Sequence, residues 1–335
     1  MVSNQLGAFE IVLTIYKFLF HLFACVTVFL FSTTLICQDK KLNNAKTRTV
    51  LGLSFSGKSS TILTPWLKKG SYTWNGPTGF LVNREIEILD AGSKSLKTFD
   101  VSGKIQKEIS FANLVQDFIS GASLIAVGTD RYIFEANGNR IIKFDNSNAA
   151  IFVRLAGINI SYMEYSPDSG FLILNVKKKK LFFLNLSGAI TGEIKFLVRS
   201  FSPLEKDLFY PVPHPTSGYF LGSDKSGILF PLGKKELLEP EVIGISKDFL
   251  LGVKFADKRG DFYHIFCYDY LGKQVYFKKF PIGSNEFHFK LTKDGELFFS
   301  IFKFNDMIGK GKYVIYRYMP PAIKIPEKQM ESLKR

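Results

Sequence analysis

The sequence motif with the most specific chemical meaning lies near the N-terminus, at Gly52–Ser59. Its eight residues, GLSFSGKS, follow the pattern G-x-x-x-x-G-K-S of a phosphate-binding loop. In such a loop the backbone amides and the lysine hold the phosphates of a nucleotide. The chemistry requires a strand before the loop and a helix after it, because the helix N-terminus supplies part of the binding site.

The residues that follow the motif argue against a nucleotide site. The stretch STILTPWLKKG, which begins at Ser59, contains several β-branched residues and then Pro65. A helix that started at Ser59 would be broken before it completed two turns. Strands and helices do not alternate elsewhere, so no parallel sheet is expected to carry a metal-binding Asp. We interpret Gly52–Ser59 as a turn between strands and predict that Lys58 binds no nucleotide.

Three histidines are the remaining candidates for chemistry, and no two of them have the spacing of zinc ligands. His264 and His288 lie in aromatic, strand-like runs, which favours packing or surface roles. His214 lies in the proline-rich segment PVPHPTSG, which predicts a solvated loop. The chain also lacks the G-x-S-x-G pattern of a nucleophile elbow and the acidic loop of a calcium site. We therefore predict no catalytic residues, no metal site and no cofactor.

The N-terminal region has the layout of an export signal. Phe18–Ile36 is an apolar run of 19 residues, preceded by Lys17 and followed by polar residues from Gln38 onward. Positive charge, an apolar run and a polar exit are typical of a secretory signal. The run is also just long enough to span a bilayer as a helix.

A cysteine at the exit of the apolar run suggests a lipid anchor. The sequence TLIC, ending at Cys37, resembles a bacterial lipobox in having Leu35 two residues before the cysteine. It departs from the lipobox in Ile36, where a small residue is usual, and lipoboxes of the spirochaete type are looser in this respect. Cys25 fits the pattern better but lies within the apolar run. We predict lipid attachment at Cys37, with an uncleaved membrane anchor or ordinary cleavage as alternatives.

All three alternatives export the rest of the chain. We therefore expect an exported bacterial protein that is anchored to a membrane, in the periplasm or at the cell surface. Cys267 is the one cysteine beyond Cys37, so no intramolecular disulfide is expected. Its apolar surroundings predict a buried side chain.

The chain is basic, with 44 Lys and Arg against 30 Asp and Glu and a net charge of +14. The basic residues are scattered, and the longest run, Lys177–Lys180, is interpreted as a solvated hairpin turn. No segment resembles a nucleic-acid-binding module, so we expect no nucleic-acid partner. The charge favours an acidic protein, an acidic polymer or anionic lipid as partner. We hypothesise that one loop face collects the lysines; an even spread that only aids solubility is the alternative.

The chain beyond residue 70 is built from repeats. Ile88–Ile105 and Ile133–Ile151 share an acidic residue, an alanine, a turn and an apolar strand that ends in Phe-Asp. Weaker copies follow at intervals of 37 to 48 residues. The residues that end the apolar strand in each copy are Asp100, Asp145, Asn185, Leu232, Asp269 and Arg317. Short turns leading into inner strands are expected in the segments 77–82, 165–174, 215–222 and 290–299.

Four short strands in every 40 to 45 residues are typical of the blades of a β-propeller. The six copies predict an all-β, six-bladed propeller over residues 70–319, with four antiparallel strands in each blade. Residues 38–69 are expected to form a linker, in which the segment 47–55 could supply a strand that closes the ring. Residues 1–37 are the signal or anchor helix, and residues 320–335 form a polar tail.

One copy carries a more specific resemblance. The stretch FEANGNRIIKFD resembles the NHL-type propeller repeat, in which a polar turn precedes Asn-x-Arg-Ile and a Phe-Asp pair. The matching residues are Asn139, Arg140, Ile141, Phe144 and Asp145. The first copy keeps only the acidic residue and the Phe-Asp pair. The resemblance implies a fold and not an activity.

These observations favour a membrane-tethered propeller that acts as a binding or scaffolding module for a protein or polymer. The alternative is a propeller enzyme, a hydrolase resembling lactonases or glycosidases, that uses the central channel. An enzyme needs acidic or histidine side chains that converge from several blades, whereas the strand starts carry mostly Phe, Leu, Ile and Gly. A role in assembling outer-membrane proteins is a third possibility, by analogy with other lipoprotein propellers.

Overall fold

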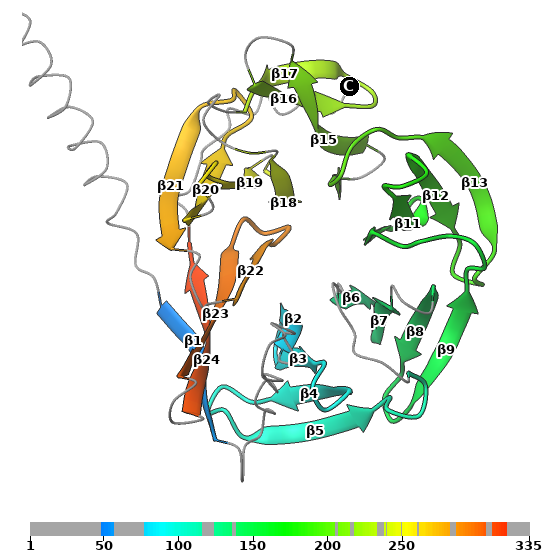
Figure 1. Ribbon diagram of the computed structural model, residues 1–335, viewed down its shortest axis with the longest axis vertical. Coiled ribbons are helices and arrows are strands. Elements are labelled where there is room, and N and C mark those ends of the chain that lie inside the picture. The colour runs from blue at the N-terminus through cyan, green and yellow to red at the C-terminus, as the bar shows by residue number, and fades with distance from the viewer. Residues whose placement is uncertain are drawn as a thin grey trace, which may run out of the picture. The chain divides into compact units, whose positions relative to one another are not determined.

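The structure is a computed structural model of the chain. It describes residues 48–56, 77–115, 124–135, 139–204, 207–214, 218–232, 238, 240–248, 250–259, 261–281, 286–305 and 310–319. Within these residues all regular structure is β-strand, arranged as six sheets of four strands. The sheets are arranged around a central axis, one after another along the chain (Figure 1). The predicted six-bladed β-propeller is therefore confirmed.

The first three blades are simple antiparallel meanders, each with its first strand nearest the axis. Blade 1 contains β2 (Pro77–Val82), β3 (Ile86–Asp90), β4 (Ser95–Phe99) and β5 (Ile105–Ser110). Blade 2 contains β6 (Leu124–Val127), β7 (Asp130–Glu135), β8 (Arg140–Phe144) and β9 (Ala149–Arg154). Blade 3 contains β10 (Tyr162–Ser166), β11 (Gly170–Asn175), β12 (Lys180–Leu184) and β13 (Ile190–Lys195).

The next two blades repeat this order, and the sixth is completed by the first strand of the propeller. Blade 4 contains β14 (Ser202–Leu204), β15 (Asp207–His214), β16 (Gly218–Ser223) and β17 (Gly227–Pro231). Blade 5 contains β18 (Glu241–Ile245), β19 (Leu251–Ala256), β20 (Phe262–Tyr268) and β21 (Gln274–Pro281). Blade 6 contains β22 (Glu286–Leu291), β23 (Leu297–Asn305), β24 (Lys310–Tyr318) and β1 (Arg48–Ser56).

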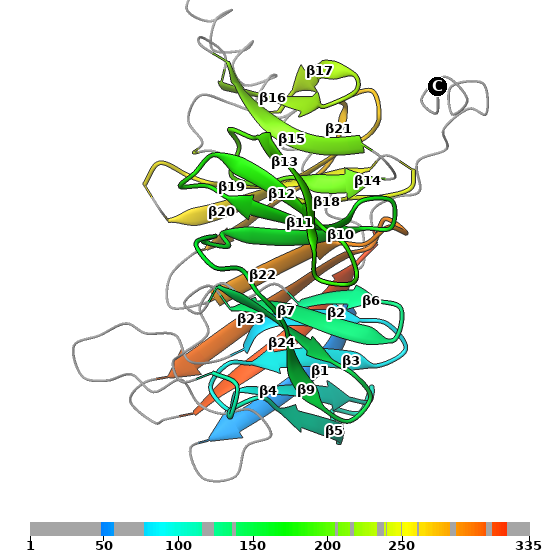
Figure 2. The same ribbon diagram turned by 90° about the vertical axis from the view of Figure 1, so that its right-hand side faces the viewer.

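The ring is closed by pairing between the two ends of the described chain. β1 pairs antiparallel with β24, with Arg48 opposite Arg317 and Ser56 opposite Lys310, and it forms the outer strand of blade 6. The two strands lie side by side in both views (Figures 1 and 2). β1 includes most of the segment 47–55 that the sequence suggested as a closing strand. Its buried residues Leu51 and Leu53 pack into the core between blades 6 and 1.

The hydrophobic cores lie between neighbouring blades. One cluster joins blades 1 and 2 through residues such as Leu89 and Ile133, and another joins blades 2 and 3 through Phe134 and Phe171. Comparable clusters join blades 3 and 4, blades 4 and 5, and blades 6 and 1. The many phenylalanines fill these spaces because each sheet has an apolar face toward both neighbours.

The polar residue that ends the third strand organises the turn to the fourth. The carboxylate of Asp100 accepts hydrogen bonds from the backbone N–H groups of Ser102 and Lys104, at 2.9 and 3.0 Å. Asp145, Asn185 and Asp269 do the same in blades 2, 3 and 5. Four of the six repeat positions predicted from the sequence therefore carry an Asx turn, which supplies partners to turn amides.

The other two repeat positions were assigned incorrectly. Leu232 follows β17, the fourth strand of blade 4, and Arg317 lies within β24. In blade 4 the third strand is β16, and the turn after it begins at Asp224. The prediction failed because β16 is GYFLGS, so no Phe-Asp pair marks its end. The segment 77–82, predicted to contain a turn leading into an inner strand, is the inner strand β2 itself, with a register shift between Pro77 and Gly79.

The turns between second and third strands share a backbone feature in three blades. Lys94, Asn139 and Lys179 each have positive φ, at 52°, 47° and 53°. Each residue lies just before its third strand begins. Lys177–Lys180 therefore occupies the hairpin position equivalent to 137–140, as the repeat predicted, although Asn137 and Gly138 lie outside the described residues.

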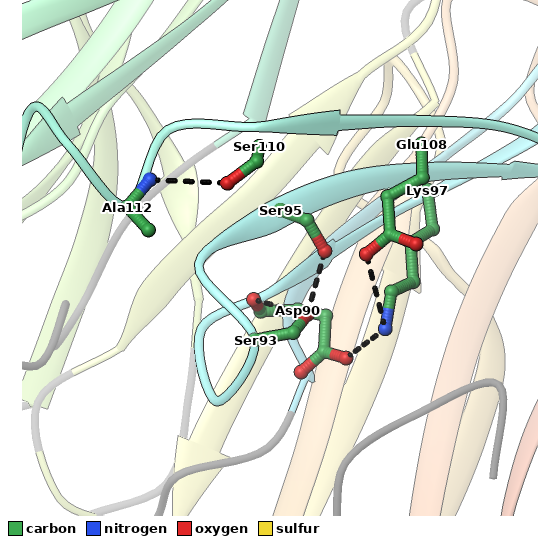
Figure 3. A network of polar contacts seen from close by, with 7 residues as sticks. All are labelled: Asp90, Ser93, Ser95, Lys97, Glu108, Ser110 and Ala112. Carbon is green, nitrogen blue, oxygen red and sulfur yellow. Dashed lines mark hydrogen bonds and ion pairs between the residues drawn. The ribbon is translucent and has the colours of Figure 1, made fainter. Parts of the chain in front are cut away.

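The acidic residue of the repeat forms a buried ion pair with the following strand. Lys97 Nζ lies 2.7 Å from the carboxylate of Asp90, whose side chain is fully buried, and 3.7 Å from that of Glu108 (Figure 3). In blade 2, Arg140 makes the equivalent contact with Glu135 at 2.7 Å. The residues that resemble the NHL-type repeat thus have a structural role in blade 2.

Residues 47–335 form one compact unit. All described strand pairs and core clusters lie in this unit, so we expect it to fold by itself. The apolar run, Cys37 and the tail after Met319 lie outside the described residues. Among the residues that the structure describes, no helix is long and apolar enough to cross a membrane.

Candidate functional site

The strands run across the thickness of the ring, so their ends define two faces (Figure 2). Since neighbouring strands are antiparallel, the turns of each blade alternate between these faces. The turns between second and third strands and the connections between blades lie on one face, which we call the lysine face. The turns between first and second strands and between third and fourth strands lie on the other, which we call the acidic face.

The two faces carry opposite excess charge in their described turns. The lysine face has seven cationic residues and two anionic ones. They are Lys94, Lys177, Lys178, Lys179, Arg199, Lys258 and Arg259, against Asp257 and Asp261. The acidic face has nine anionic residues and six cationic ones. They are Glu85, Asp100, Asp145, Asp168, Asp224, Asp248, Asp269, Asp294 and Glu296, against Arg84, Lys104, Lys225, Lys247, Lys273 and Lys293.

A cavity of about 830 Å³ occupies the central channel. All six blades contribute to it through their first strands or the residues beside them. It extends from Arg199 at the lysine face to Lys293 at the acidic face. Apolar side chains such as Phe80 and Ile243 form part of its wall, and ionisable side chains from blades 3, 5 and 6 form the rest. The size is that of a typical small-molecule site.

Blade 3 places a tyrosine and a carboxylate in the channel. Tyr162 and Glu164 are two residues apart on β10, so their side chains leave the same face of the strand. Tyr162 Oη donates a hydrogen bond of 2.9 Å to Glu164 Oε1. Burial raises the pKa of both groups, while Lys290 and Lys293 lower that of Glu164. Glu164 is therefore an acidic group held within the channel, where burial favours its neutral form and the lysines of blade 6 favour its ionised form.

Blade 6 places an amine on another side of the channel. Lys290 lies near the end of β22 and lines the cavity. Burial lowers the pKa of its amine, whereas attraction to Glu164 and Glu87 raises it. No described carboxylate lies within ion-pair distance of Lys290, although Lys254 on β19 pairs with Glu241 at 2.5 Å. Lys290 is thus a half-buried cation whose balancing charges are more distant.

His288, two residues before Lys290 on the same strand, also lines the cavity. Burial and the nearby Lys254 lower its pKa to about 4, while a hydrogen bond to the Pro77 backbone opposes the shift. The imidazole is therefore neutral at physiological pH. Its Nε2 is buried without a hydrogen-bond partner in the described part of the chain.

The other two histidines of the described residues, His214 and His264, are not among the residues that line the channel. His264 on β20 packs near the ring of Phe266, with centroids 6.4 Å apart, in keeping with its aromatic surroundings. His214 is the last residue of β15 and lies opposite Gly218, so the prediction of a loop at this position was wrong. Cys267 is fully buried, as expected. In the described ranges, no group of three or more His, Cys, Asp or Glu side chains is placed to hold a metal ion.

The first part of the predicted phosphate-loop motif is an extended strand. Gly52 to Ser56 belong to β1 and pair with Val314 to Lys310 on β24. In a phosphate-binding loop the corresponding backbone curves around the ligand. Gly57, Lys58 and Ser59 lie outside the described residues, so the absence of a nucleotide site stays a prediction.

Sequence analysis missed the channel residues because they lie in different strands far apart along the chain. The expectation of mostly apolar strand starts was wrong, because the six inner strands begin with Pro77, Leu124, Tyr162, Ser202, Glu241 and Glu286. Glu164, Glu241, His288 and Lys290 are polar residues of these strands that the fold brings around one cavity. In the sequence, each of them appears as a charged residue or a histidine within the apolar first strand of a blade, as in YMEYS and EFHFKL.

No family model matches the chain, and no curated protein matches it either. Its fold is similar to that of virginiamycin B lyase from Staphylococcus aureus, at 12% identity and a TM-score of 0.47, covering 83% of this chain and 90% of the lyase. It is also similar to a member of the DUF4221 family from Bacteroides vulgatus, at 10% identity and a TM-score of 0.49, with 84% and 100% covered. A DUF4623 family protein from Bacteroides eggerthii has 10% identity and a TM-score of 0.47, with 83% and 77% covered.

These likenesses extend to the propeller fold alone. They include an enzyme and families known only by number, and at this level of identity they carry no argument about activity.

Proposed function

We propose that this protein is an exported, membrane-tethered propeller that binds an acidic protein or polymer on its lysine face. The observation that carries the proposal is the separation of charge between the two faces. The described turns of the lysine face have an excess of five positive charges, and those of the acidic face an excess of three negative charges. An acidic partner is therefore attracted to one face and repelled by the other.

The positive charge is concentrated around blade 3. Lys177, Lys178 and Lys179 are exposed in the β11–β12 turn, and the exposed Arg199 follows β13 on the same face. Lys178 Nζ donates a hydrogen bond of 2.7 Å to the Gly157 carbonyl. This bond directs the Lys178 side chain over the connection between blades 2 and 3, which contains Gly157. Charges this close reinforce one another, since the screening length is about 8 Å at physiological salt.

The experiment compares two triple variants of residues 47–335 that change the net charge equally. One is Lys177→Glu/Lys178→Glu/Lys179→Glu on the lysine face. The other is Lys104→Glu/Lys225→Glu/Lys273→Glu, three exposed lysines on the acidic face. Binding to immobilised poly-L-glutamate is measured at low and high salt. We expect the lysine-face variant to lose at least tenfold in affinity and the acidic-face variant to lose less than threefold.

Equal losses in the two variants would show that net charge, and not the lysine face, governs binding. The same measurement on vesicles containing phosphatidylglycerol separates anionic lipid from an acidic polymer. Retention on vesicles together with no binding to poly-L-glutamate would contradict the proposed class of partner.

An enzyme that uses the channel is the second candidate, because the channel contains three carboxylates and a neutral histidine. Glu164, Glu241 and His288 come from blades 3, 5 and 6, which is the convergence that catalysis requires. A panel of lactones and nitrophenyl glycosides tests this candidate. Turnover that is lost in both Glu164→Gln and His288→Ala would favour the enzyme over a pure binding module.

A further inference from the structure

We propose that the central channel is a binding site for a small amphipathic organic anion that carries one negative charge, such as an aliphatic or aromatic carboxylate. The site is separate from the lysine face, and the inference does not depend on the proposed function. It follows from the size of the cavity, its apolar wall and the position of Lys290.

The cavity fits a ligand of metabolite size. Its volume of about 830 Å³ lies within the range of small-molecule sites. Phe80, Val82, Ile243 and Phe298 provide apolar surface from blades 1, 5 and 6. Contact between this apolar wall and water is less favourable than contact between the wall and a hydrocarbon chain or ring. The body of the ligand is therefore apolar.

Lys290 supplies the reason for a negative charge. Its side chain is half-buried, lines the cavity and makes no ion pair with the described residues. A buried charge is costly unless a counter-charge and hydrogen-bond acceptors accompany it. A carboxylate in the cavity would provide both, and burial would strengthen the interaction.

The net charge of the residues that line the cavity favours a ligand with one negative charge over a ligand with several. The described lining residues include four cations and three anions. These are Arg199, Lys254, Lys290 and Lys293, against Glu164, Glu241 and Asp294. Glu241 and Lys254 pair with each other, which leaves three cations against two anions. The neutral His288 adds no charge. One further negative charge therefore balances the lining residues.

Glu164 and Tyr162 determine where the anionic group lies. Both are on β10 of blade 3, across the ring from β22 of blade 6, which carries Lys290 (Figure 1). The Glu164 carboxylate repels a second anion and leaves the side of Lys290 as the favoured position. The Tyr162 hydroxyl is engaged with Glu164, so this side of the channel accepts a neutral hydrogen-bond donor more readily than an anion.

The test uses two fluorescent probes with similar apolar bodies and different charge. One is 1-anilinonaphthalene-8-sulfonate, which carries one negative charge, and the other is the neutral N-phenyl-1-naphthylamine. Both are titrated against residues 47–335 and the variants Lys290→Met and Glu164→Gln. Lys258→Met, an exposed lysine in a turn of the lysine face, is the control.

We expect Lys290→Met to weaken binding of the anionic probe at least tenfold and to change binding of the neutral probe less than twofold. Glu164→Gln is expected to strengthen binding of the anionic probe about threefold, because it removes the opposing carboxylate. The control is expected to match the parent protein. Decanoate should displace the anionic probe, and decanol should displace it much less.

The inference is overturned if the parent protein does not bind the anionic probe, or if its affinity is the same in all variants. It is also overturned if both probes lose affinity equally in Lys290→Met, since apolar contact alone would then explain binding. Lys290→Met removes a half-buried charge and adds none, so we expect it to fold. Thermal unfolding checks this, and Glu164→Gln tests the same site with the opposite direction of change.

Discussion

Arg140 joins two elements of the propeller that are distant along the chain. Its Nε lies 2.7 Å from the Glu135 carboxylate on the neighbouring strand, and its NH1 group donates to the Leu114 carbonyl at 2.7 Å. Leu114 belongs to the connection that leaves blade 1. The arginine therefore holds the turn of blade 2 against the preceding blade.

Replacing Arg140 by Ala is expected to lower the free energy of unfolding by about 3 kcal/mol, since it leaves the buried Glu135 without its counter-charge. Arg140→Lys keeps the charge but not the second contact, and should lose about 1 kcal/mol. Urea denaturation measures both. Arg154→Ala, an exposed arginine on β9, is the control and should change stability by less than about 0.5 kcal/mol.

Closure of the ring through β1 predicts that a substitution near the N-terminus destabilises the whole propeller. Leu51 is 2% exposed and packs with Phe298 and Ile315. Leu51→Ala should cost about 2 to 4 kcal/mol in a single unfolding transition. Leu186→Ala, in an exposed turn, should leave stability unchanged. Loss of blade 6 alone, seen as a second transition, would contradict closure by a single cooperative ring.

A pair of carboxyl groups in blade 4 predicts a pH dependence. Burial and the hydrogen-bonded Asp207 raise the pKa of Asp224 to about 6, above its ordinary value of 3.8. Ionisation of Asp224 is therefore less favourable in the folded chain than in the unfolded chain. The contribution of the protonated Asp224 to stability is lost as the pH rises from about 4 to about 6. The pKa of Asp207 is lowered by hydrogen bonds, so its contribution is lost only as the pH falls below 3.8.

Asp224→Asn should remove the decline in melting temperature between pH 4 and pH 6 without changing the behaviour below pH 3.8. Asp168→Asn, an exposed carboxyl in the β10–β11 turn, is the matched control. A decline that persists in Asp224→Asn would assign the titration to another group.

The proposed lipid anchor is tested on the full chain. Cells are labelled with a clickable fatty acid, and we expect Cys37→Ala to abolish the label while Cys25→Ala retains it. Loss of label in Cys25→Ala alone would move the attachment site into the apolar run. Label in both variants would leave neither cysteine as the single site.

The sequence contained enough local information to predict the number of blades. The turns that follow β4, β8, β12 and β20 need a side chain that accepts hydrogen bonds from backbone amides, so Asp or Asn recurs at each. Blade 4 was misread because its third strand ends in Ser223, with Asp224 in an atypical turn. The repeat can be recognised in the sequence only in blades whose turns use the same kind of hydrogen-bonding side chain.

The channel could not be predicted in this way. Glu164 and Lys290 lie on opposite blades, and their interaction depends on how six sheets close into a ring. Each residue by itself is one charged position in an apolar strand. Only the number and order of blades fixes which first strands face each other, so the cavity becomes visible with the three-dimensional structure.

The pairing of β1 with β24 also determines when, during synthesis of the chain, the ring can close. β1 leaves the ribosome before any blade, yet its partner is made last, roughly 13 to 50 seconds later at ordinary rates of translation. During that interval the apolar side chains of Leu51 and Leu53 have no sheet to join. The ring can therefore close only after the chain has been completed. Until then the chain cannot complete its sixth blade, so the propeller folds late in synthesis.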